Sequence, residues 1–145
     1  MATAELQSAA PSSPEELAET LAAAAERKQP VRIRGGATKF DWGVRGEGAP
    51  ALEVSTEHLT GIVEHNAGDM TAVVEAGISL RHAQQAFAAE GQMLALDPPD
   101  LGGATLGGVV ATADSGPLRS RYGAARDLVL GVRVALSDGT LAQAG

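Results

Sequence analysis

The sequence predicts an α+β fold, because segments with helical and with strand periodicity alternate along one chain of 145 residues. Residues 14–27 have an apolar stripe at helical spacing, and residues 31–34 alternate apolar and charged side chains as a strand does. Two glycine-rich segments, residues 34–39 and 97–126, lie between the regular elements. Glycine allows close backbone approach, so both segments are candidates for ligand binding.

The composition is that of a globular protein, which we expect in the cytoplasm. Apolar residues make up 44% of the chain, without a long uncharged hydrophobic run or a signal peptide, so we expect no membrane span. No cysteine is present, which excludes disulfides and metal or cluster sites built on thiolates of this chain. The net charge of −7 argues against nucleic-acid binding.

The first half of the chain contains clear signals for two helices. Residues 1–12 are small and polar, and we expect them to form a disordered tail. Ser13 is a suitable N-cap for a helix that runs to about Arg27. Ser79 can cap a second helix, which would end near Gly91. The predicted inner faces of the two helices comprise Leu17, Leu21, Ala24, Leu80, Ala83 and Phe87.

Strand-forming runs surround these helices. We expect strands at residues 31–34, where Val31 and Ile33 form a buried face, and at 51–55. Residues 61–65 and 70–76 flank a polar turn and predict a hairpin, and residues 93–96 predict a further strand. A last hairpin is expected around a turn at 137–140, after the alternating run 132–136.

These elements suggest a domain over residues 13–145 with two lobes. The first lobe would comprise residues 13–96, and residues 97–145 would begin a second lobe. The second strand of the last hairpin has only started at Gly145, and a lone hairpin is marginal in water. We therefore expect a truncated chain, whose residues 115–145 are mobile and which alone binds a cofactor weakly or not at all and is inactive.

The first glycine cluster has the features of an anion site. Main-chain N–H groups of Gly35, Gly36 and Ala37 can converge on one phosphate, and Thr38 adds a hydroxyl. Basic residues also fall beside both clusters: Arg32, Arg34, Lys39, Arg119, Arg121 and Arg126. The sequence lacks GxGxxG and the P-loop pattern, so an ordinary structural turn remains the alternative.

Other site chemistry finds little support. The three histidines, His58, His65 and His82, lack metal-ligand spacing, so no metal site is expected. Ser115 precedes a glycine without a nucleophile elbow around it. The carboxylates of Asp97, Asp100 and Asp114 form no defensible acid–base pair. Catalytic residues are therefore left unassigned.

An ordered set of motifs resembles the FAD-binding domain of the vanillyl-alcohol oxidase, or PCMH-type, flavoprotein family. The motifs are RGGATKFDWG at 34–43, DPPD at 97–100, ATLGG at 104–108, SGP at 115–117, YG at 122–123 and RDLVLG at 126–131. Within the family, the resemblance is strongest to the FAD-binding subunits of bacterial glycolate oxidases. It implies a PCMH-type FAD-binding fold, with a first α/β lobe and the beginning of a second.

The resemblance also implies a cofactor site and partners. The implied FAD-binding residues are Gly35, Gly36, Ala37, Thr38, Lys39, Pro98, Thr105, Gly107, Gly108, Ala111, Thr112, Ser115 and Gly116. Members with covalent flavin have a histidine where this chain has Thr38, so non-covalent FAD is implied. The implied partners are a small-molecule 2-hydroxy acid and other oxidoreductase subunits, among them an iron–sulfur subunit.

The function implied is oxidation of glycolate or a similar 2-hydroxy acid, with hydride transfer to FAD. One alternative is an FAD-dependent oxidoreductase with another alcohol, a sugar or a partner-held molybdenum centre as its reactant. Another is a flavin-fold module without catalysis, which holds a partner subunit. Bound flavin in the purified protein separates the last alternative from the others.

Overall fold

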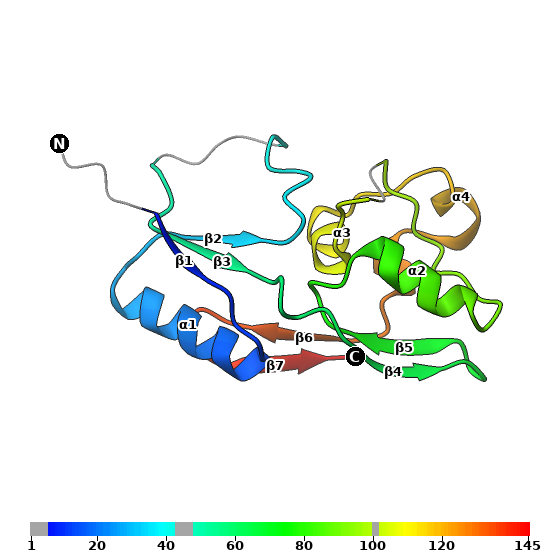
Figure 1. Ribbon diagram of the computed structural model, residues 1–145, viewed down its shortest axis with the longest axis horizontal. Helices are drawn as coiled ribbons and strands as arrows, with labels where there is room; N and C mark the ends of the chain where they lie inside the picture. Colours follow the sequence, from blue (N-terminus) through cyan, green and yellow to red (C-terminus); the bar gives the residue numbers. More distant parts are fainter. Residues whose placement is uncertain (1–5, 43–47, 100–101) are drawn as a thin grey trace. The chain divides into compact units, whose positions relative to one another are not determined.

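The computed structural model describes residues 6–42, 48–99 and 102–145, and its mixture of helices and strands confirms the α+β class (Figure 1). The chain forms two compact units. The first unit comprises the residues up to Arg34 together with Trp42–His58 and Gly131–Gly145. The second comprises Gly35–Asp41 and Leu59–Leu130. None of the helices in the described ranges has the length and apolar character needed to cross a membrane.

The first unit contains a parallel sheet in the order β1 (Gln7–Ala9), β3 (Leu52–Ser55) and β2 (Val31–Arg34). Helix α1 (Pro14–Glu26) begins as expected, since Ser13 Oγ accepts a hydrogen bond from the Glu16 N–H at 3.1 Å. Its small core consists of Ala24, Leu52 and Val54, with Ala9 and Leu17 packed against it.

The predicted disordered tail is wrong over part of its length. Residues 7–9 form β1, which pairs with β3, and the Gln7 N–H donates to the Ala51 carbonyl at 3.0 Å. Pro11 is fully buried. The partner strand supplies the stabilising hydrogen bonds, so a short polar segment can be ordered without a local signal. Residues 1–5 lie outside the described residues.

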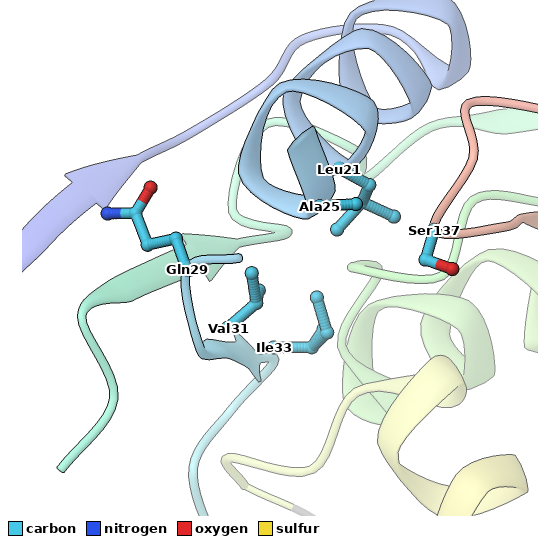
Figure 2. A pocket seen from close by; sticks show the side chains of 6 residues that line it. All are labelled: Leu21, Ala25, Gln29, Val31, Ile33 and Ser137. Carbon is cyan, nitrogen blue, oxygen red and sulfur yellow. The ribbon is translucent and has the colours of Figure 1, made fainter. Parts of the chain in front are cut away.

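Strand β2 forms where expected, but its apolar face is not buried. Val31 is 36% exposed and Ile33 51% exposed. Figure 2 shows both side chains directed toward Leu21 and Ala25 of α1, across a groove of about 340 Å³ that Gln29 and Ser137 complete. Ala24 of α1 packs in one cluster with Leu52 and Val54 of the middle strand, whereas Val31 and Ile33 of the edge strand stay partly exposed.

The last hairpin, β6 (Val132–Ala135) and β7 (Leu141–Ala144), is antiparallel and belongs to the first unit. Its turn has the expected chemistry: Asp138 Oδ1 accepts from the Thr140 N–H at 2.9 Å, and Gly139 has a φ of +85°. A Cβ atom added at Gly139 would lie 3.1 Å from the Ala22 Cβ, so the turn rests on α1.

The second unit contains a hairpin of β4 (Ile62–Asn66) and β5 (Thr71–Val74) and helix α2 (Leu80–Ala88), all close to the predicted positions. Ser79 caps α2, as predicted, and accepts a hydrogen bond from the His82 N–H. The core cluster comprises Ile78, Leu80, Ala83, Phe87, Leu96, Ala104, Leu106, Val109 and Ala125.

Two features of the second unit differ from the prediction. Residues 93–96 form no strand. A side chain of α2 bonds this segment where a strand would have a partner strand: the Leu94 N–H donates to Gln84 Oε1 at 3.0 Å. The glycine-rich segment contains an unexpected helix, α3 (Leu106–Thr112). Two short helices, α4 (Arg119–Tyr122) and α5 (Ala125–Leu128), follow.

The compact units also divide the chain elsewhere than the predicted lobes at 13–96 and 97–145. Residues 97–130 share a unit with residues 59–96, and the last hairpin shares a unit with α1. Long-range packing decides this division, which local patterns along the chain do not encode.

Candidate cofactor site

All thirteen candidate cofactor residues lie in the second unit. They fall on two segments: the first glycine loop, residues 35–41, and the second glycine segment, residues 102–116, with Pro98 just before it. The two segments are far apart in sequence, and the structure packs their backbones directly against each other.

Two glycines of the first loop make this contact. A Cβ atom added at Gly35 would lie 2.4 Å from Thr105 Oγ1, and one at Gly36 would lie 1.6 Å from the carbonyl oxygen of Gly103. Neither distance allows a side chain. The absence of side chains at these positions therefore brings the two backbones together, in addition to any role in ligand approach.

The first glycine loop presents main-chain donors. Within the described part of the chain, the N–H groups of Gly35, Gly36 and Ala37 form no hydrogen bond. Ala37 has a φ of +57°, in the left-handed region that alanine rarely adopts. Successive N–H groups around such a residue form a concave anion-binding arrangement, so the loop is suited to a phosphate.

Helix α3 is anchored at its beginning. Thr105 Oγ1 accepts from the Gly108 N–H at 3.2 Å, and the Leu106 N–H donates to the Ile78 carbonyl at 3.0 Å. A Cβ atom at Gly107 would lie 2.9 Å from the Ala76 carbonyl oxygen. Gly107 therefore serves the packing of α3 on residue 76.

The remaining candidates extend the same region. The hydroxyls of Thr112 and Ser115 bond to the Gly108 and Ala113 carbonyls, respectively. A Cβ atom at Gly116 would lie 2.0 Å from the Asp97 carbonyl oxygen. The structure thus brings Gly116 next to Asp97, the residue before Pro98. Pro98 itself is buried. Ala111 is exposed on α3, and Thr38 is half-buried in the first loop.

Three of the six basic residues expected beside the glycine clusters, Arg32, Arg34 and Lys39, are paired with carboxylates. Arg32 bonds to Glu53 through Nε at 2.9 Å and Nη2 at 2.6 Å, and Arg34 Nη1 lies 3.8 Å from the same carboxylate. In the second unit, Lys39 Nζ lies 3.2 Å from Asp114 Oδ2. Near the first glycine loop, main-chain N–H groups are therefore available to an anion, whereas the charge of Lys39 is already paired.

Sequence reasoning missed Gly103 and the role of Asp114. The Gly103 carbonyl oxygen lies where a Cβ atom of residue 36 would be, and Asp114 pairs with Lys39. Nothing in the local pattern connects these partners, because each contact joins the two glycine segments. Asp100 and Gly43, which belong to the quoted motifs, lie outside the described residues.

Comparisons with known proteins agree on one family. A family model described as FAD binding domain matches residues 6–145. D-lactate dehydrogenase of Archaeoglobus fulgidus is 34% identical over 140 residues, which cover 93% of this chain and 30% of that protein. Glycolate oxidase subunit GlcD of Bacillus subtilis is 30% identical over 138 residues, covering 94% and 29%. The chain thus spans about three tenths of these relatives' length.

Solved structures show the same fold. 6-Hydroxy-D-nicotine oxidase from Arthrobacter nicotinovorans matches 94% of this chain and 29% of its own, with a TM-score of 0.82 and 17% identity. An alkyldihydroxyacetonephosphate synthase matches 90% of this chain and 26% of its own, with a TM-score of 0.80 and 22% identity.

Proposed function

The chain belongs to the FAD-binding domain family of FAD-linked oxidoreductases, and we propose that it forms the FAD-binding part of an enzyme that oxidises glycolate or a similar 2-hydroxy acid. The family membership confirms the PCMH-type fold and identifies FAD as the cofactor. The substrate class is supported by relatives named for D-lactate, glycolate and D-2-hydroxyglutarate, which are all 2-hydroxy acids.

The residues of the first glycine loop fit a dinucleotide. The unbonded N–H groups of Gly35, Gly36 and Ala37 carry the proposal, since a pyrophosphate supplies the acceptors that these donors need. The second glycine segment would lie along the flavin and its ribityl chain. Thr38 stands where the resemblance places the histidine of covalent-flavin members, which supports a non-covalent FAD.

When bound, FAD supplies the acceptor for the hydride that leaves the substrate α-carbon. The protein's own contribution in this region is to bind and orient the dinucleotide through main-chain donors. The base that takes the hydroxyl proton is not assigned among the described residues. We further propose that the enzyme works with other oxidoreductase subunits, since two relatives are named as subunits. An iron–sulfur subunit among these partners and a cytoplasmic location are also proposed.

Ala37 allows a direct test of the phosphate site. Its left-handed backbone accepts Asp and Asn with less strain than most residues, so Ala37→Asp and Ala37→Asn differ chiefly in charge. We expect Ala37→Asp to weaken FAD binding by about 1.4 kcal/mol or more, a tenfold change, relative to Ala37→Asn. Flavin fluorescence titration measures both affinities. Equal affinities would exclude the pyrophosphate from this loop.

The substrate class needs a separate experiment. The flavin-loaded enzyme is mixed anaerobically with glycolate, D-lactate, a simple alcohol or a sugar. We expect the 2-hydroxy acids alone to bleach the flavin absorbance. Bleaching by the alcohol or the sugar instead would assign that compound class as the substrate. An intact enzyme that binds no flavin would favour the interaction module.

A further inference from the structure

The second unit contains an ion pair that joins the two glycine segments. Lys39 Nζ lies 3.2 Å from Asp114 Oδ2, and both side chains are largely buried, with exposures of 14% and 6%. The same Asp114 oxygen has no hydrogen-bond partner in the described part of the chain. The contact is therefore ionic and close, but not aligned as a hydrogen bond, and the ammonium is the nearby group that compensates the carboxylate charge.

Burial makes this pair hard to break. A buried carboxylate without a compensating charge is strongly unfavourable, so removal of one partner costs more than the pair contributes over neutral groups. If Lys39 turned away to bind a phosphate, Asp114 would be left buried and without its cation. The position of Lys39 beside a phosphate loop is thus a poor guide to its role.

The backbone on both sides of the pair is constrained. Ala37, two residues before Lys39, has a φ of +57°, and Ala113, directly before Asp114, has a φ of +53°. Alanine in the left-handed region persists only where surrounding contacts hold it. The ionic contact between Lys39 and Asp114 can hold both alanines in this conformation, because it joins the first loop to the end of α3.

We propose that Lys39 is a positioning residue, which holds the first glycine loop in its anion-binding conformation through Asp114 and does not itself bind the cofactor phosphate. The proposal rests on the proposed FAD site. It makes Asp114 as important for FAD binding as Lys39, although the two side chains have opposite charges.

Four variants test this role: Lys39→Met, Asp114→Asn, their combination, and the charge-conserving Lys39→Arg. The first measurement, without FAD, is amide hydrogen exchange of residues 36–41. We expect exchange to accelerate about tenfold in each single variant, to be no faster in the double variant, and to stay near the parent value in Lys39→Arg. Arg133→Met removes the exposed Arg133–Glu15 pair of the first unit and should leave the loop unchanged.

The second measurement is FAD affinity. We expect Lys39→Met and Asp114→Asn to weaken binding by similar factors of about ten, and Lys39→Arg to retain it. If Lys39 were a phosphate ligand, Asp114→Asn would retain or tighten FAD binding while Lys39→Met weakened it, and that pattern would overturn the proposal. Unchanged loop exchange in both single variants would also overturn it.

The two measurements fail separately. An intact enzyme containing this chain that binds no FAD would contradict the proposed function, whereas the exchange rates without FAD would still decide whether the ion pair holds the loop.

Discussion

Left-handed backbone at alanine is the most informative feature at the scale of single residues. Ala37 lies in the first glycine loop and Ala113 caps the end of α3, where a glycine is common. A left-handed conformation costs alanine about 1–2 kcal/mol more than glycine. Part of this difference is offset, because a glycine at the same position would lose more conformational entropy on folding. Strain is thus stored at both sides of the candidate site.

Ala113→Gly should therefore raise the free energy of unfolding by about 0.5–1 kcal/mol, measured by urea denaturation. Ala111→Gly is the matched control, because residue 111 has ordinary helical geometry inside α3. It should lower the free energy of unfolding by about 1 kcal/mol. Destabilisation by both glycines would show that residue 113 is not strained.

At this scale the structure reveals contacts of the candidate residues that the sequence did not predict. Gly36 stood out as a flexible residue near a ligand, yet the structure shows that its Cβ position is occupied by the Gly103 carbonyl. Asp114 was considered only as an acid or base, since its partner Lys39 is remote in sequence. Steric and ionic contacts between distant segments cannot be read from either segment alone.

At the scale of elements, capping signals were reliable and glycine signals were not. Ser13 and Ser79 marked the beginnings of α1 and α2 correctly. Helix α3 was missed because Gly107 and Gly108 have low helix propensity, while Thr105 at its N-cap and buried Val109 stabilise it. Tertiary packing overrode propensity there, as it did for β1.

The beginning of α1 predicts a dependence of stability on pH. Hydrogen bonds from the Ser12 N–H and hydroxyl hold the pKa of Glu16 below its ordinary value of 4.5. The folded state therefore binds protons less readily than the unfolded state. This contribution to stability is complete above pH 4.5 and is lost as the pH falls through the lower folded pKa.

We expect Glu16→Gln to reduce the loss of stability between neutral pH and pH values below 4.5, because the variant cannot titrate at this position. Urea midpoints measured across this range test the effect. Glu19→Gln, at an exposed position of the same helix, is the control. An identical acid profile for Glu16→Gln and the parent would show that the Ser12 contact does not stabilise α1.

At the scale of the whole molecule, the residues that the structure describes form two hydrophobic cores, one in each unit. Val54 belongs to the core of the first unit, and Val109 belongs to that of the second. The candidate cofactor residues all lie in the second unit, although the predicted lobes had distributed them over both. The order of elements could not reveal this division, because the last hairpin returns to α1.

This division predicts that the two cores contribute differently to FAD binding. Val54→Ala and Val109→Ala remove the same two methyl groups from fully buried positions, so each should lower the free energy of unfolding by about 2 kcal/mol. Val109 packs α3, which supports Thr105 and hence the first glycine loop. We therefore expect Val109→Ala to weaken FAD binding several-fold and Val54→Ala to leave the affinity unchanged, under conditions where both variants remain folded by circular dichroism. Equal losses of affinity would mean that the cofactor depends on both cores alike, and the site would then extend beyond the second unit.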